Sequence, residues 1–338
     1  MIFNSRTKHN VLKIIQKIKS ILRVGMLSRI KVGTTALYFN PNHDEVIRDY
    51  YLYVLELLAQ AAKSCQLKAN IVLGDYEVSR RDSKLNFRID FQIEHTLVKQ
   101  GGRGAEHAPM GVVPVPGDPT QCYLVRVQNF GRLGRSDALI EYSRPNLVNL
   151  QSSHLYPELV EKLHYIAPLV YPVDEPIPDV QQRDLEIITL FGNPEEPRRK
   201  ALLDTLKRWN PRCQNISGRF DDIHDIYLRT RILVNIRQTD HHDTLEELRV
   251  LPALLSGVIV ISEDVPLRAE VPYQEFILWA SLNELPSLVQ EVHENYAKYH
   301  ARVYSGSGLR ACLSAIEVAN QDTARRLLAQ LEARGPGR

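Results

Sequence analysis

The chain has 338 residues, more than one ordinary compact core uses, and this length predicts two domains of about 150 residues each. Hydrophobic residues make up 44% and charged residues 24%, with 17 Gly and 19 Pro, which excludes a disordered or fibrous protein. The 42 Lys and Arg against 40 Asp and Glu give a net charge of +2, so charge indicates no nucleic-acid partner.

The first 31 residues carry apolar side chains at helical spacing with lysines between them, and this pattern predicts a basic amphipathic helix. The favoured interpretation packs that helix on its own domain. The alternative is a peripheral contact with an anionic membrane surface. No apolar run reaches the roughly 18 residues of a membrane helix, and no signal peptide is recognisable, so we expect a cytoplasmic protein.

Residues 32–172 are predicted to form an N-terminal α/β domain. A strand at 35–40, a helix at 45–67 and a strand at 69–73 make one βαβ unit of a parallel sheet. A glycine-rich segment at 99–104 and a proline-rich stretch to residue 119 predict a mobile loop. Further strands are expected at 87–98, 121–127, 137–142 and 165–169, before a proline-rich linker at about 170–184.

Residues 185–310 alternate strand and helix as a doubly wound sheet requires, and residues 311–338 read as a C-terminal helix and tail. The predicted strands are 185–191, 232–236, 258–262 and 276–279. The predicted helices are 196–209, 222–230, 245–255 and 284–303. Two Rossmann-like domains are therefore the expected architecture.

A turn and a cationic helix start follow the first strand of the second domain. This segment contains Asn193, Arg198, Arg199 and Lys200. Ligands of open α/β sheets bind at the carboxyl ends of the strands, and helix N-termini favour anions, so the segment predicts a phosphate site. The alternative is a solvated charged face.

The next strand ends in the most concentrated polar run of the chain, at residues 235–249. Its candidate ligand-binding residues are Arg237, His241, His242, Glu246, Glu247 and Arg249. A carboxylate there can accept hydrogen bonds from ribose hydroxyls, and an arginine can pair with phosphate. The metal interpretation of residues 240–243 is disfavoured because no HExxH or DxD pattern completes a coordination shell, so we expect no metal site and no cofactor.

The order of these elements, with the run Pro-Ala-Leu-Leu-Ser-Gly-Val-Ile-Val-Ile-Ser at 252–262, resembles the C-terminal donor domain of GT-B-fold glycosyltransferases. The resemblance covers about residues 185–300. It implies two Rossmann-like domains facing a central cleft, a nucleotide sugar on the C-terminal domain and an acceptor on the N-terminal domain. Arg198, Arg199 or Lys200 would lie near the diphosphate, and Glu247 and Arg249 near the nucleoside or sugar. Thr244 and Pro252 replace the paired glutamates of the common retaining families, so direct transfer with inversion is preferred.

Sugar transfer to a hydroxyl needs a base, and Glu94 and His95 lie at the end of a predicted N-terminal strand, just before the glycine-rich segment. The expected partners are a nucleotide-sugar donor and a glycan or lipid-linked acceptor. Two alternatives stay open, namely another nucleotide-sugar-dependent enzyme and a non-catalytic nucleotide- or sugar-binding module. A dinucleotide-binding dehydrogenase is disfavoured because no GxGxxG joins a strand to a helix.

Overall fold

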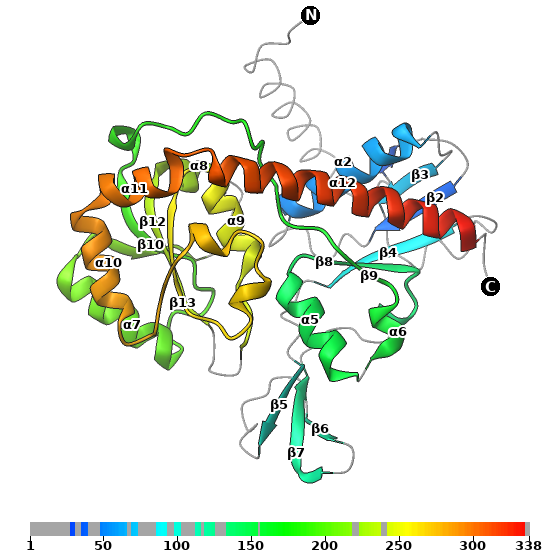
Figure 1. Ribbon diagram of the computed structural model, residues 1–338, viewed down its shortest axis with the longest axis horizontal. Helices are drawn as coiled ribbons and strands as arrows, with labels where there is room; N and C mark the ends of the chain where they lie inside the picture. The colour runs from blue at the N-terminus through cyan, green and yellow to red at the C-terminus, as the bar shows by residue number, and fades with distance from the viewer. Residues whose placement is uncertain are drawn as a thin grey trace, which may run out of the picture.

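The computed structural model describes two β-sheets with their helices, a third small sheet and one long helix common to both halves (Figure 1). The described residues are 28–30, 35–39, 48–65, 69–73, 86–92, 98–102, 112–115, 118–125, 133–154, 156–217, 223–237 and 242–334. We call the six-stranded sheet and its helices the N-terminal lobe, and the five-stranded sheet and its helices the C-terminal lobe.

The sheet of the N-terminal lobe has the strand order β1-β3-β2-β4-β8-β9. All neighbours pair in parallel except β1 with β3. The strands are β1 (Ser28–Ile30), β2 (Thr35–Phe39), β3 (Ala69–Leu73), β4 (Asn86–Gln92), β8 (Ala138–Glu141) and β9 (Leu163–Tyr165). The described part of this lobe contains the helices α2 (Arg48–Ser64), α5 (Arg144–Ser153) and α6 (Pro157–Val160). The predicted βαβ unit is present as β2, α2 and β3.

A separate antiparallel sheet interrupts the N-terminal lobe between β4 and β8. Its order is β5-β7-β6, with β5 (Val98–Gly102), β7 (Asp118–Val125) and β6 (Val112–Val115). The mobile loop predicted from residue 99 to residue 119 is therefore wrong where β5, β6 and the start of β7 lie, because β5 and β6 both pair with β7. Proline 114 is accommodated because β6 is an edge strand whose register shifts between Pro114 and Val115.

The sheet of the C-terminal lobe is parallel throughout, with the strand order β11-β10-β12-β13-β14. Its strands are β10 (Leu185–Thr189), β11 (Cys213–Asn215), β12 (Thr230–Asn235), β13 (Ile259–Glu263) and β14 (Leu278–Ala280). Its helices are α7 (Pro197–Trp209), α8 (Ile223–Arg229), α9 (Glu247–Leu255), α10 (Leu285–Glu294) and α11 (Tyr296–Tyr304). The single helix predicted at 284–303 is wrong in one respect, because it breaks at Asn295, which ends α10 and begins α11.

The sheet of the C-terminal lobe is covered by helices on both faces. Its strands are buried on both sides, as their continuous apolar runs predict. Ile188, Leu233 and Val260 face a core that contains α8, α9 and the start of α12. Their neighbours Ile187, Ile232 and Ile259 face the opposite core, which α7, α10 and α11 cover. Successive residues of a strand point to opposite faces, so these two sets alternate along each strand.

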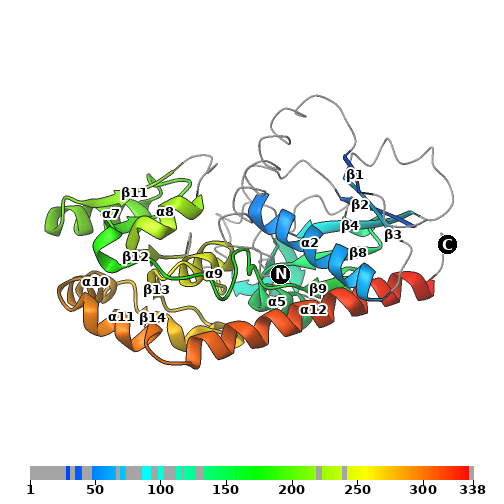
Figure 2. The same cartoon turned by 90° about the horizontal axis from the view of Figure 1, so that it is seen from above.

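Helix α12 (Gly308–Arg334) joins the two lobes. Its first half places Leu309, Leu313 and Ile316 in the core of the C-terminal lobe, and its second half places Leu327 and Leu331 against α2. Both views show this helix running along one side of both lobes (Figures 1 and 2). The two lobes therefore share one continuous helical support.

Candidate functional site

The candidate site lies at the carboxyl ends of β10, β12 and β13. From β10 the chain runs to the edge strand β11, and it then returns across β10 to β12, so the winding direction reverses between β10 and β12. Ligands of open α/β sheets bind outside the strand ends at such a switch point. The residues that follow these strand ends are therefore the first candidates for ligand contacts.

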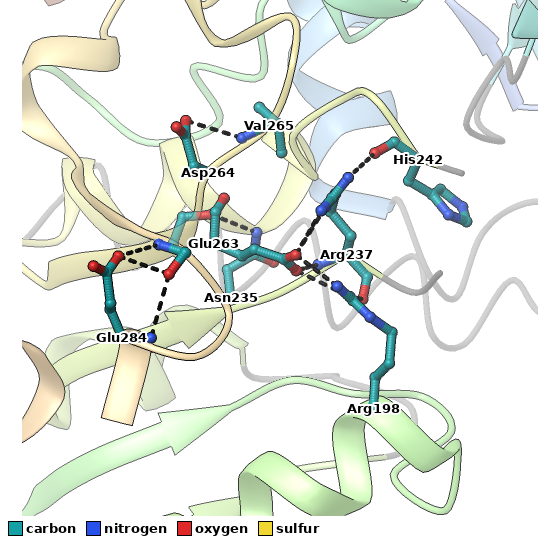
Figure 3. A network of polar contacts seen from close by, with 10 residues as sticks. Arg198, Asn235, Arg237, His242, Glu263, Asp264, Val265 and Glu284 are labelled. Carbon is teal, nitrogen blue, oxygen red and sulfur yellow. Dashed lines mark hydrogen bonds and ion pairs between the residues drawn. The ribbon is translucent and has the colours of Figure 1, made fainter. Parts of the chain in front are cut away.

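Glu263, the last residue of β13, holds two arginines at this switch point (Figure 3). Arg198, from the first turn of α7, donates from its two Nη atoms to the two carboxylate oxygens at 3.0 and 2.6 Å. Arg237, two residues after β12, donates from Nε at 3.0 Å and from Nη2 at 2.8 Å to Oε1, and its backbone N–H donates to Oε2 at 3.0 Å. Two further bonds, from Arg198 to the carbonyl of Arg237 and from Arg237 to that of His242, belong to the same network.

Glu263 forms ion pairs with both guanidinium groups of this cluster. Burial by itself would raise the pKa of Glu263, but the hydrogen bonds and charges of Arg198 and Arg237 outweigh burial and lower that pKa. The Glu263 side chain is 2% exposed, while those of Arg198 and Arg237 are 15% and 18% exposed. One carboxylate thus fixes two guanidinium groups that still reach the surface, which suits a phosphate-bearing ligand.

The start of α7 is less open to an anion than the sequence suggests. The carboxylate of Glu196 caps the helix and accepts from the backbone N–H of Arg199 at 3.2 Å. The Arg199 guanidinium is buried, 4.9 Å from the centre of the Phe191 ring. Lys200 is exposed and paired with Glu195 at 2.5 Å, and Asn193 is exposed. Of the four residues predicted here, only Arg198 joins the cluster around Glu263.

The residues predicted in the polar run after β12 do not form one site. His242 is 2% exposed and reaches the cluster through its carbonyl oxygen. Glu246, the N-cap residue of α9, pairs with Arg249 of that helix at 3.8 Å. Glu94, His95 and His241 lie outside the described residues, so their predicted roles stay predictions.

Glu247, the first residue of α9, is fully buried between the lobes. Its Oε1 accepts from the backbone N–H of Arg144 at 3.1 Å, and its Oε2 accepts from the hydroxyls of Tyr165 at 3.2 Å and Tyr273 at 3.0 Å. Burial raises the pKa of this carboxyl to about 7, although these hydrogen bonds act to lower it. The predicted contact with the donor stays untested, and both oxygens are engaged by protein.

Sequence reasoning missed Glu263, Tyr165 and Tyr273. One signal for Glu263 was present, since it is the first charged residue after the buried run at 258–262. No local pattern could have found the partners of Glu247, which lie 103, 82 and 26 residues from it along the chain.

Among the residues that the structure describes, no three His, Cys, Asp or Glu side chains come together as a metal site would require. Within the same residues, no helix has the length and apolar character needed to cross a membrane.

No family model matches the sequence, and no curated protein matches it either. Solved structures do match. HepE from Anabaena, solved in complex with UDP and glucose, is 9% identical, with 89% of this chain and 100% of HepE covered at a TM-score of 0.51. An α1,3-fucosyltransferase solved with GDP-fucose is 12% identical, with 83% and 84% covered at a TM-score of 0.40. This chain has the GT-B fold.

The GT-B fold predicted from the sequence is thus confirmed, and the contacts of Glu247 indicate how its two sheets meet. Arg144 follows the carboxyl end of β8, Tyr165 ends β9, and α9 follows the carboxyl end of β12. Because all three meet at one carboxylate, the carboxyl ends of the two sheets approach each other. Both sheets also share one strand order, since β3-β2-β4-β8-β9 repeats the pattern of β11-β10-β12-β13-β14.

Proposed function

We propose that the chain is a glycosyltransferase that moves a sugar from a nucleotide-sugar donor to a hydroxyl of a glycan or lipid-linked acceptor, without a metal ion. The observation that carries this proposal is the arginine pair at the switch point of the C-terminal sheet, where Glu263 holds both guanidinium groups. The GT-B fold supports it, and the HepE structure contains UDP and glucose.

In this proposal Arg198 and Arg237 bind the diphosphate of the donor. As the bond between the sugar carbon and the diphosphate oxygen breaks, negative charge grows on that oxygen, and two fixed guanidinium groups stabilise it. We assign this role to the arginines rather than to the dipole of α7, because Glu196 already caps that helix. Asn193, Arg199, Lys200, His241, His242, Glu246 and Arg249 are kept as weaker candidates for donor contacts.

The acceptor in this proposal binds on the N-terminal lobe. Glu94 or His95 takes the proton of its hydroxyl while the oxygen attacks the sugar carbon, so the sugar is transferred directly with inversion. Both residues follow β4 in the sequence, and β4 is the strand beside which the winding direction of the N-terminal sheet reverses. This position supports a role at the acceptor side of the reaction.

Turnover measured without divalent ions tests the proposal. The protein is incubated with UDP-, GDP-, CMP- and dTDP-linked sugars in EDTA, and release of the nucleotide is followed with and without glycan acceptors. We expect release from one donor class, and we expect Glu94→Gln or His95→Gln to lower the turnover number with donor binding retained. Donor binding without any release would favour a binding module, and release that requires a metal ion would contradict the proposed mechanism.

A further inference from the structure

Glu247 makes its hydrogen bonds to both lobes although it belongs to one. The donors at Arg144 N and Tyr165 Oη come from α5 and β9 of the N-terminal lobe. The third donor, Tyr273 Oη, precedes η5 (Gln274–Phe276) of the C-terminal lobe. The carboxylate is therefore both a part of α9 and a bridge to the opposite lobe.

Hydrogen-bond donors surround the carboxyl group of Glu247, and they act against the effect of burial on its pKa. Arg144 is the first residue of the ten-residue helix α5, whose N-terminal amides and dipole favour a negative charge. A second contact between the lobes runs beside it, since Arg144 Nε lies 3.3 Å from Glu270 Oε2 in η4 (Arg268–Glu270). The titratable or charged groups around Glu247 are Tyr50, Glu141, Arg144, Tyr165, Glu270 and Tyr273, and on its own helix Glu246 pairs with Arg249.

Glu247 differs from the two arginines around Glu263 in its exposure to solvent. Glu247 is 0% exposed and both of its oxygens accept from protein groups, whereas Arg198 and Arg237 keep part of their surface. Helix α9 begins only ten residues after Arg237, so a shift of Glu247 relative to the N-terminal lobe would also shift the segment that carries the cluster.

We propose that Glu247 is a positioning residue that pins the donor-side helix α9 to α5 and β9 of the acceptor-side lobe. This role rests on the proposed function, in which each lobe holds one substrate. Transfer between two bound substrates depends on their separation, and a misplacement of about 1 Å can cost on the order of 100-fold in rate. The carboxylate acts through this geometry and does not touch the donor.

Two tyrosines offer a matched pair of variants. Tyr165→Phe and Tyr273→Phe each remove one hydroxyl from the same oxygen of Glu247, but only Tyr165 belongs to the opposite lobe. The first readout is hydrogen–deuterium exchange of a peptide that spans Arg144 and begins several residues before it, because the amide of Arg144 donates to Glu247. We expect faster exchange there in Tyr165→Phe and Glu247→Ala, and wild-type exchange in Tyr273→Phe.

The second readout is nucleotide release from UDP-glucose and GDP-fucose, whichever of them the wild type uses. We expect Tyr165→Phe and Glu247→Ala to lower kcat about 10-fold or more with the donor KM within about twofold, and Tyr273→Phe to stay near wild type. Equal effects of the two tyrosine variants would overturn the proposal, as would loss of donor binding in Glu247→Ala. Tyr165→Phe carries the test if Glu247→Ala does not fold.

The two proposals can fail separately. If the exchange pattern is as expected but no nucleotide sugar is bound or consumed by the wild type, the link between the lobes stands and the proposed function is wrong. If the wild type turns over donor while exchange at α5 is unchanged in all three variants, the positioning role is wrong and the proposed function stands.

Discussion

The carboxyl of Glu247 makes the stability of the chain depend on pH. Because burial raises its pKa from the usual 4.5 to about 7, the folded protein keeps a proton that the unfolded chain has released over that window. The stability from this group is thus present below about pH 4.5 and lost as pH rises to about 7, by roughly 3 kcal/mol at most.

Glu247→Gln removes this titration while keeping the shape of the side chain. We expect its free energy of unfolding, measured in urea from pH 5 to 8, to rise relative to the wild type as pH increases. Glu294→Gln, at an exposed position on α10, serves as the control and should keep the wild-type slope. Parallel profiles for wild type and Glu247→Gln would contradict the burial of an ionisable group at this position.

At the scale of residues, the sequence identifies candidate site residues that follow a recognisable strand. It does not identify which distant residues pair with them in the folded chain. Arg198 and Arg237 are found because each follows a strand whose apolar run is recognisable. Glu263 is assigned no role from sequence because its partners lie 65 and 26 residues away. Tertiary pairing of this kind has no periodic signal.

Helix α9 ends in a Schellman motif that requires a glycine. The N–H of Val258 donates to the carbonyl of Ala253, the N–H of Gly257 donates to that of Leu254, and Gly257 has a φ of 79°. A Cβ at Gly257 would lie 2.3 Å from Ile177 Cγ2 and 2.6 Å from Arg183 Nη2. The turn is therefore closed to any side chain both by its backbone and by its neighbours.

We expect Gly257→Ala to lower the free energy of unfolding by about 2 kcal/mol or more, measured by urea denaturation. Gly192→Ala is the matched control, because nothing lies within 4 Å of its added Cβ, and it should change stability little. A Gly257→Ala variant as stable as the wild type would contradict the closeness of Ile177 and Arg183 to this turn.

At the scale of elements, long apolar strands and amphipathic helices are predicted correctly, and short polar elements are not. β10, β12 and β13 agree with the expected strands within two residues at each end. β11 was missed because its three residues, Cys213–Asn215, carry no alternation. α5 was missed because its residues follow no apolar stripe, although Ser143 caps it and Pro145 lies in its first turn.

Asn320 ties the middle of α12 to the segment between β9 and β10 and to α2. Its Oδ1 accepts from the backbone N–H of Ala167, and its Nδ2 donates to the Ala167 carbonyl and to the Tyr53 hydroxyl, all at 2.9 Å. Asn320 is buried, so replacing it would leave the two backbone groups of Ala167 without partners.

Asn320→Leu should lower the free energy of unfolding by about 2–4 kcal/mol, because two buried polar groups of the backbone lose their hydrogen bonds. Gln321→Leu, the next residue on the same helix, is the control and should change it by well under 1 kcal/mol. Urea denaturation of both variants provides the comparison. Equal losses would mean that the amide of Asn320 does not hold α12 to the segment between the lobes.

At the scale of the molecule, the alternation of strands and helices is enough to predict two parallel sheets, because parallel strands need crossover helices. The sequence predicts one strand of the β5-β7-β6 sheet, at 121–127, but neither of its partners β5 and β6, whose glycines and proline are typical of loops. It also does not predict that α12 packs on both lobes, since an apolar stripe does not identify the surface that covers it.

The central claim is that Arg198 and Arg237 bind the diphosphate of a nucleotide sugar, and calorimetric titration with UDP and GDP in EDTA tests it most directly. Arg198→Lys and Arg237→Lys keep the charge beside Glu263 but lose the planar fork of donors. Arg229→Lys is the control, because Arg229 pairs with Asp184 at 2.8 Å at the opposite, amino-terminal edge of the same sheet. The account predicts that the wild type and Arg229→Lys bind one nucleotide equally and that the other two variants bind it about 10- to 100-fold more weakly. Absence of binding by the wild type, or equal binding by all four proteins, would contradict it.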